Sequence, residues 1–124
     1  MAKLLHAALI LLLVTLCPPL AQAAPSTHDA QNGLPAVTLA ELPGEARETL
    51  NAIKQGGPFT YDRDGVVFGN YEQILPKQAR GYYHEYTVRT PGAPGRGVRR
   101  IVCGPLPECY YTADHYQTFK RIRE

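Results

Sequence analysis

Apolar residues recur at helical spacing between residues 46 and 53, and later residues alternate as strands do. Ala46, Leu50 and Ile53 fall at positions i, i+4 and i+7, which places them on one face of a helix. Pro43 near the first turn and the Gly-Gly-Pro at 56–58 mark its two ends. The pattern predicts a helix of about three turns whose apolar face belongs to the core.

After this helix, short apolar and aromatic runs are separated by Gly, Pro, Asn and Asp, which is typical of strands joined by turns. Successive strands with short links favour an antiparallel sheet, and the one helix must cover it. We therefore expect an α+β fold with an N-terminal helix packed on a single antiparallel β-sheet. The predicted strands are 66–68, 81–88, 98–103, a segment from Tyr110, and a last one at 116–122.

The first residues have the pattern of an export signal. Lys3 precedes an apolar run at 9–16, and Ala21-Gln22-Ala23 is a small-x-small cleavage site, so residues 1–23 are predicted to be a signal peptide. A membrane helix is the alternative, but the run is short for a span and no second apolar segment follows. A lipoprotein anchored at Cys17 is disfavoured by Leu16, because lipid attachment prefers a small residue there.

The rest of the chain divides into a leader and one small domain. Residues 24–38 hold few apolar anchors and are predicted to be a flexible leader, and 39–124 should form a single domain. Residues 24–76 carry 3 basic and 7 acidic side chains, whereas 77–124 carry 9 basic and 4 acidic ones. A basic C-terminal half suits an anionic ligand such as a nucleic acid, although a solvated surface would have the same composition.

Two cysteines remain after signal cleavage. Cys103 and Cys109 are separated by Gly-Pro-Leu-Pro-Glu, so they could bridge the two strands of a hairpin in an exported protein. We predict this disulfide; the alternative is a pair of free thiols in a reducing compartment.

Glu85 is the expected chemical centre, because a strand is a poor place for a carboxylate that has neither a partner nor a function. Side chains alternate across a strand, so Tyr83, Glu85 and Thr87 should share one face. His84 points to the other face, which excludes a metal pair made from these two neighbours. On a later strand, Arg100 is predicted to lie beside Glu85 against the sheet surface.

Two further side chains complete this predicted group. Arg96 lies in a Gly-flanked loop from which it can reach the rim of the site, and His115 lies at the bend before the last strand. A carboxylate, an imidazole and two guanidiniums suit phosphodiester transesterification, in which RNA supplies the nucleophile as its 2′-hydroxyl. Such an enzyme requires no metal and no cofactor.

The same residues make the sequence resemble the small secreted guanyl-preferring ribonucleases, the barnase-like microbial group. The likeness covers roughly 39–122, and several motifs occur in the same order. They are Asp64-Gly65-Val66-Val67-Phe68, Asn70 with Glu72, Leu75-Pro76, Tyr83-His84-Glu85-Tyr86-Thr87-Val88, Thr90-Pro91-Gly92, Arg99-Arg100-Ile101, and Tyr111-Thr112 with Asp114-His115-Tyr116.

The resemblance implies a role for each matching catalytic position. Glu85 would be the general base for the 2′-hydroxyl, and His115 the general acid for the leaving 5′-oxygen. Arg96 and Arg100 would hold the scissile phosphate, together with Tyr116. The product would be a 2′,3′-cyclic phosphate, which is hydrolysed afterwards.

Guanine recognition is expected at 68–72. A carboxylate such as Glu72 can accept both N–H donors of the guanine edge, and adenine would leave that carboxylate unpaired. Phe68 and Tyr71 are stacking candidates, and Asn70 belongs to the same segment. At positions 69 and 71, where this sequence has Gly69 and Tyr71, members of the family that it resembles carry larger or differently charged residues.

The sequence thus predicts a secreted, monomeric endoribonuclease that cleaves single-stranded RNA after guanosine. A catalytically inactive RNA-binding or toxin-like module on the same scaffold is the first alternative, and a disulfide-stapled extracellular interaction domain is the second. The resemblance also suggests an acidic cytoplasmic inhibitor protein as a partner, and no membrane association is expected after signal cleavage.

Overall fold

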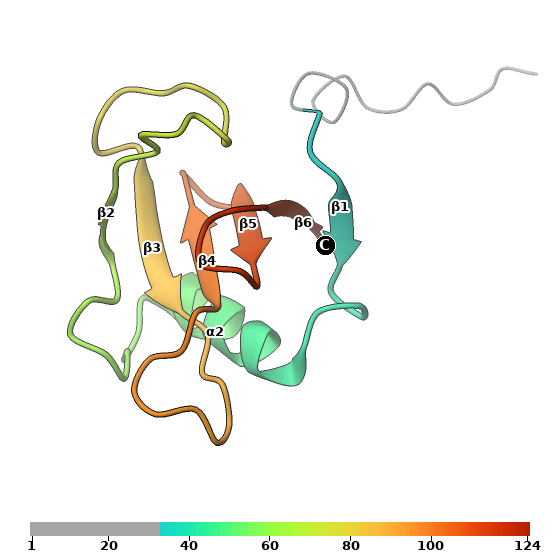
Figure 1. Cartoon of the computed structure of the whole chain (residues 1–124), viewed down its shortest axis with the longest axis vertical. Helices are drawn as coiled ribbons and strands as arrows, with labels where there is room; N and C mark the ends of the chain where they lie inside the picture. Colours follow the sequence, from blue (N-terminus) through green and yellow to red (C-terminus); the bar gives the residue numbers. More distant parts are fainter. Residues whose placement is uncertain (1–32) are drawn as a thin grey trace, which may run out of the picture.

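A computed structural model describes residues 33–124, and the predicted signal peptide and most of the predicted leader lie outside this part of the chain. One helix packs on a six-stranded sheet of order β1-β6-β5-β4-β3-β2 (Figure 1). The elements are β1 (Ala36–Thr38), α2 (Gly44–Gln55), β2 (Val66–Phe68), β3 (Tyr83–Thr87), β4 (Arg100–Cys103), β5 (Cys109–Thr112) and β6 (Lys120–Arg123). This confirms the α+β class.

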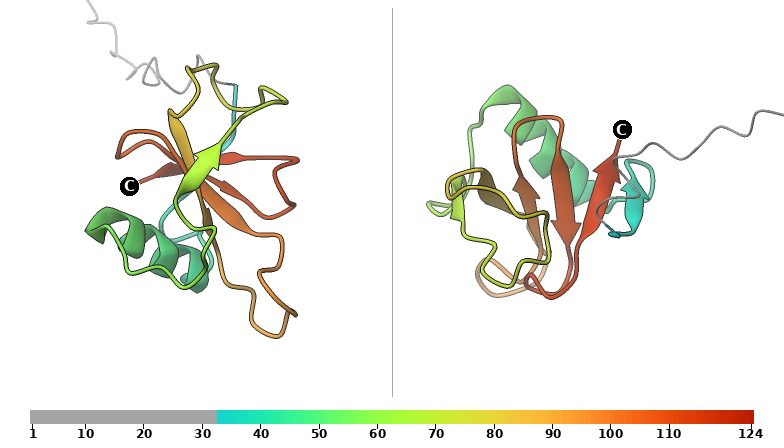
Figure 2. Two further views of the ribbon diagram at one scale, coloured as in Figure 1. Left: turned by 90° about the vertical axis from the view of Figure 1, so that its left-hand side faces the viewer. Right: turned by 90° about the horizontal axis from the view of Figure 1, so that it is seen from above.

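The helix forms where the apolar spacing predicts it. Ala46, Leu50 and Ile53 are all buried, and they pack with residues of β4, β5 and β6 in one core cluster. Gly56 ends the helix in the left-handed conformation at φ 78°, where glycine carries no steric penalty, and its N–H bonds the helix carbonyls. Figure 2 shows α2 on one side of the sheet, so the other side is free for a second set of side chains.

The sheet is mixed, which corrects the prediction of a purely antiparallel one. Strands β2 to β6 pair antiparallel with their neighbours, but β1 pairs parallel with β6, with Val37 opposite Ile122. Because β1 occupies 36–38, the sheet begins before Leu39, and the predicted leader boundary lies too late. Val37 anchors this strand through burial in the helix-side core.

The predicted disulfide is present in the β4–β5 hairpin. Cys103 and Cys109 are directly opposite each other in the antiparallel register, and their sulfur atoms are bonded. Both side chains are buried in the core on the helix side of the sheet. The bond therefore links the two central strands beneath the hairpin turn.

A second core cluster covers the sheet face opposite the helix. It consists of Leu75, Tyr83, Val102, Tyr110 and Phe119, with Phe68 and Tyr116 packed against it. No helix in the described range 33–124 is long and apolar enough to cross a membrane. This second face carries the predicted site.

Candidate active site

Strand β3 places Glu85 on the sheet face opposite the helix. Burial of the side chains alternates along β3: Tyr83, Glu85 and Thr87 are buried, and the residues between them are only half-buried. Glu85 is 7% exposed, so its carboxylate is largely removed from water. His84 lies on the other face, where its Nδ1 is 2.9 Å from the carbonyl oxygen of Gly65. The alternation therefore separates the two residues as the sequence predicts.

The phenol of Tyr116 links the carboxylate to an arginine. Its Oη donates a hydrogen bond to Glu85 Oε1 at 3.1 Å and accepts one from Arg100 Nε at 3.2 Å. Arg100 is only 3% exposed, and its Nη1 donates to the carbonyl oxygen of Arg99 at 2.7 Å. Burial, and then the nearby Glu85 carboxylate, raise the pKa of Tyr116 while Arg100 opposes them, so this hydroxyl keeps its proton at neutral pH.

A second arginine approaches the carboxylate from the 88–99 loop. Arg96 Nη2 is 3.8 Å from Glu85 Oε1, a distance for an ion pair rather than a hydrogen bond. Two of its nitrogens, Nε and Nη2, donate instead to Thr87 Oγ1 at 3.0 and 2.9 Å. The two guanidiniums thus reach the same sheet face as Glu85 from different elements.

His115 is exposed in the turn between β5 and β6, next to Tyr116. The predicted last strand began at Tyr116, but both residues have positive φ, 54° and 70°, and β6 starts only at Lys120. The prediction was wrong here because such a left-handed pair breaks an extended chain. The His115 ring centroid is 4.8 Å from that of Tyr116, and the His115 N–H donates to the carbonyl oxygen of Val98 at 3.1 Å.

A network around Asp114 holds this turn in its strained conformation. The carboxylate accepts hydrogen bonds from the hydroxyls of Thr112 and Thr118 and from the Thr118 N–H. The Tyr116 N–H donates to Thr112 Oγ1 at 3.1 Å. The hydrogen bonds from Thr118 are the main cause that lowers the pKa of Asp114, so the carboxylate is charged in the folded protein over the neutral range.

The predicted guanine-binding segment forms a loop after β2. Asn70 has φ 51°, and its side chain is engaged within the loop, with Oδ1 accepting from the Leu75 N–H and Nδ2 donating to the Leu75 carbonyl oxygen. The Asn70 side chain therefore shapes the loop. Glu72 is exposed.

Two aromatic side chains flank this loop. The ring of Phe68 stacks on Tyr116 with centroids 5.2 Å apart, so Phe68 is both a core residue and a wall of the site. Tyr71 is 81% exposed, and its ring lies over Gly69, where a Cβ would stand 2.5 Å from ring carbons. Arg80 Nη1 donates to the Tyr71 hydroxyl at 2.9 Å. Glycine at 69 is what allows Tyr71 to lie in this position.

One cavity of about 420 Å³ joins the loop to the catalytic face. Its volume is within the usual range for a small-ligand site. It is lined by Arg63, Val67, Phe68, Gly69, Asn70, Tyr71, Glu72, Ile74, Glu85, Tyr116 and Phe119. The four predicted guanine-binding residues therefore share a cavity with the predicted base, Glu85, and with Tyr116.

The sequence did not predict the contacts of several residues in this region. Arg63 lines the cavity, Thr87 holds Arg96, and Arg80 contacts Tyr71. Alternation along β3 placed Thr87 on the face of Glu85, but the partner of its hydroxyl depends on a loop that no local pattern describes. Among residues 33–124, no group of three or more His, Cys, Asp or Glu side chains is arranged to hold a metal ion.

Comparison with known proteins identifies the family. Residues 24–123 match the ribonuclease family. The chain belongs to this family. Guanyl-specific ribonuclease Sa of Kitasatospora aureofaciens is 60% identical over 87 residues, covering 69% of this chain and 91% of that protein. Guanyl-specific ribonuclease St of Saccharopolyspora erythraea is 53% identical over 89 residues, covering 72% and 88%.

This ribonuclease is also similar to a third guanyl-specific ribonuclease and to solved structures of ribonuclease Sa2. Guanyl-specific ribonuclease Sa3 of Kitasatospora aureofaciens is 56% identical over 87 residues, and the match spans 62% of its length. The structure of ribonuclease Sa2 with mononucleotides has a TM-score of 0.72 at 50% identity, covering 73% of this chain and 95% of that one. Ribonuclease Sa2 with guanosine-2′-cyclophosphate has a TM-score of 0.69 at 51% identity, covering 73% and 96%.

Proposed function

We propose that this ribonuclease cleaves single-stranded RNA on the 3′ side of guanosine by transesterification and then hydrolyses the cyclic product. The observation that carries the proposal is the shared cavity, in which the 68–72 loop and Glu85 stand on one surface beside Tyr116. Relatives named as guanyl-specific ribonucleases support the base preference. The bound guanosine-2′-cyclophosphate of ribonuclease Sa2 supports the cyclic intermediate.

In the first step, Glu85 takes the proton of the 2′-hydroxyl as the 2′-oxygen attacks phosphorus. His115 gives a proton to the 5′-oxygen as the P–O5′ bond breaks, so a 2′,3′-cyclic phosphate and a free 5′-hydroxyl form. The burial of Glu85 and its place beside Arg96 and Tyr116 support the role of base. In the second step the roles reverse: His115 takes a proton from the water that attacks phosphorus, and Glu85 protonates the 2′-oxygen as the P–O2′ bond breaks, which leaves a 3′-phosphate.

Arg96, Arg100 and Tyr116 would stabilise the charge that develops on the phosphate oxygens. A planar guanidinium suits phosphate, and fixed donors in a partly dry site stabilise a transition state more than mobile water does. The burial of Arg100 and its hydrogen bond to the Tyr116 hydroxyl support this assignment, because they set the orientation of the guanidinium before substrate binds.

Guanine would be chosen by Glu72 and the loop backbone, with Phe68 and Tyr71 flanking the base. The exposed Glu72 carboxylate can accept from the two adjacent N–H groups of guanine, which adenine lacks. Asn70 would act by holding the loop, because its side chain bonds within it.

The remaining sequence expectations belong to the same proposal. We infer export by a signal peptide at 1–23, a leader that ends near residue 35, and a monomeric ribonuclease domain that follows it. An exported nuclease needs protection inside the producing cell, so an acidic cytoplasmic inhibitor would fit the basic residues of the site.

Cleavage of four dinucleotides, GpC, ApC, CpC and UpC, in excess chelator tests this function. We expect rapid cleavage of GpC alone. Equal cleavage of all four would refute the guanine preference while leaving the ribonuclease activity. If the folded protein cuts none of them, the inactive RNA-binding alternative replaces the proposal.

A further inference from the structure

Thr87 occupies a position that the catalytic assignment leaves unexplained. It is the last residue of β3, two positions after Glu85 and on the same face, and it is only 4% exposed. Its Oγ1 accepts two hydrogen bonds from one guanidinium, from Arg96 Nε at 3.0 Å and Nη2 at 2.9 Å. A buried hydroxyl that receives two donors of the same arginine fixes both the position and the plane of that group.

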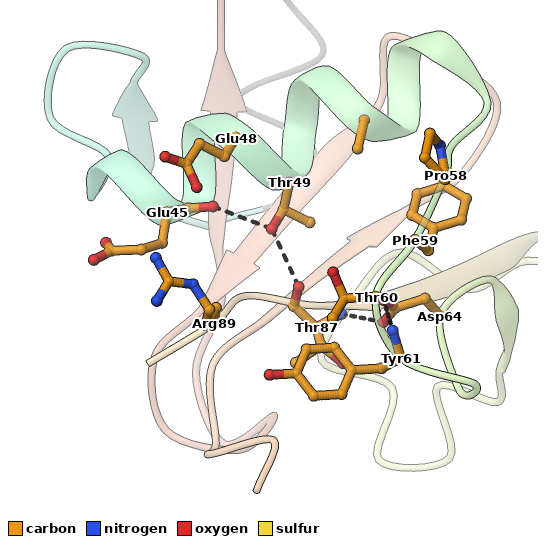
Figure 3. A pocket seen from close by; sticks show the side chains of 11 residues that line it. Glu45, Glu48, Thr49, Pro58, Phe59, Thr60, Tyr61, Asp64, Thr87 and Arg89 are labelled. Carbon is orange, nitrogen blue, oxygen red and sulfur yellow. Dashed lines mark hydrogen bonds between the residues drawn. The ribbon is translucent and has the colours of Figure 1, made fainter. Parts of the chain in front are cut away.

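The backbone of Thr87 is itself fixed on both sides. Its N–H donates to Asp64 Oδ1 at 2.7 Å, and its carbonyl oxygen accepts from Thr49 Oγ1 at 3.1 Å. Figure 3 shows these two contacts coming from different elements, one from the turn before β2 and one from helix α2. The same turn is closed by the Tyr61 N–H, which donates to Asp64 Oδ2 at 3.2 Å. Thr87 therefore connects the helix side of the domain to the catalytic side.

Arg96 requires such a support because the loop that carries it does little to fix the conformation of its side chain. Gly95 and Gly97 flank it with φ of 69° and 63°, and a free arginine side chain has many rotamers. Glu85 Oε1 is 3.8 Å away, too far for a hydrogen bond, and Arg100 carries a like charge on the same face. The hydroxyl of Thr87 is neutral, so it orients the guanidinium without neutralising the charge that a phosphate needs.

We propose that Thr87 is a positioning residue that holds the Arg96 guanidinium ready for the scissile phosphate. This role rests on the proposed function, in which Arg96 binds the phosphate. It goes beyond that function because Thr87 acts through Arg96 and needs no contact with RNA.

Two substitutions separate the hydroxyl from the shape of the side chain. Thr87→Val keeps the branched shape and removes the hydroxyl, whereas Thr87→Ser keeps the hydroxyl and removes the methyl. Each is measured at 25 °C after circular dichroism confirms folding, and Thr87→Ala replaces Thr87→Val if the latter does not fold. The readouts are kcat and KM for GpC, and calorimetric binding of inorganic phosphate and of guanosine.

Thr87→Val should lower kcat/KM about tenfold to a hundredfold, the loss expected from a misplaced positioning group. Phosphate affinity should fall with it, guanosine affinity should stay the same, and Thr87→Ser should behave like wild type. In an Arg96→Ala background, Thr87→Val should change neither the rate nor phosphate binding, because the two residues act as one unit.

Three results would overturn this role. They are a folded Thr87→Val enzyme with wild-type rate and phosphate affinity, a Thr87→Ser enzyme as impaired as Thr87→Val, or an undiminished effect of Thr87→Val without Arg96. A wild-type protein that leaves GpC intact would instead refute the proposed function. The phosphate titrations would still decide the role of Thr87, and wild-type protein that binds no phosphate would refute that role as well.

Discussion

Replacing Tyr116 with phenylalanine removes one hydroxyl and two contacts of the candidate site. The ring stays, so its stacking on Phe68 at 5.2 Å is kept. The bond to Glu85 Oε1 and the bond from Arg100 Nε are both lost. Because Glu85 and Arg100 are 7% and 3% exposed, water replaces the missing oxygen poorly.

The expected loss follows from these contacts. A hydrogen bond to a charged group contributes roughly 1.5–3 kcal/mol. Arg100 keeps its bond to the Arg99 carbonyl and Glu85 keeps the nearby Arg96, so we expect each loss to fall below this range, at about 1 kcal/mol per bond and about 2 kcal/mol for the two bonds together. For a domain of this size, that lowers the unfolding temperature by roughly 10 °C. With a less well oriented base, kcat/KM for GpC should fall about tenfold.

The matched control is Tyr82→Phe. The Tyr82 hydroxyl donates to Glu108 Oε2 at 2.7 Å, at the β4–β5 hairpin, so its removal should lower stability and leave kcat/KM unchanged. Urea denaturation and initial rates on GpC measure the two quantities. The Tyr116→Phe deficit should also be present throughout the neutral pH range, because the raised pKa of Tyr116 keeps its hydroxyl protonated there. A Tyr116→Phe enzyme with the wild-type urea midpoint and rate would refute this account.

Four further predictions concern the pH dependence of the rate, alkaline unfolding, base choice and the disulfide. The rate on GpC should be bell-shaped in pH, since the active form needs Glu85 ionised and His115 protonated; a rate that rises steadily into alkali would contradict these roles. Burial or hydrogen bonding to Glu108 raises the pKa of five phenols above 10.0, those of Tyr82, Tyr83, Tyr86, Tyr110 and Tyr116. The stability that these phenols contribute is therefore present below pH 10 and is lost as the pH rises further. Their ultraviolet titration should coincide with alkaline unfolding, and early, reversible ionisation of all five would contradict this prediction. Glu72→Gln should lower kcat/KM for GpC about a hundredfold or more and leave ApC cleavage unchanged, whereas an equal loss on both would exclude Glu72 from base choice. The Cys103–Cys109 bond closes only a short loop, so its reduction should lower the free energy of unfolding by about 2 kcal/mol in urea denaturation, and an unchanged midpoint would show that the bond is dispensable.

Local patterns predicted the parts of the fold that depend on neighbouring residues. Helix spacing placed Ala46, Leu50 and Ile53 in the core, and alternation along β3 placed Glu85 and Thr87 together on one buried face. Each of these inferences needs only the periodicity of one element.

Contacts between distant segments were beyond such patterns. Strand β1 has three residues and one buried side chain, Val37, and it is defined by pairing with β6 at the other end of the domain. The left-handed turn at His115 depends on Asp114 and Thr112, whose hydrogen bonds the alternation of apolar residues does not report. The partnership of Thr87 with Arg96 likewise appears only when the 88–99 loop folds back on β3.

The most direct test of the acid–base account is to follow the products of GpC cleavage by phosphorus NMR, with wild-type enzyme, Glu85→Gln and His115→Gln. The account predicts that wild type first releases guanosine 2′,3′-cyclic phosphate and later converts it to the 3′-phosphate. Each folded variant should lose about a hundredfold or more of the first step. A 5′-phosphate product, or a variant that keeps the wild-type rate of cyclisation, would contradict the account.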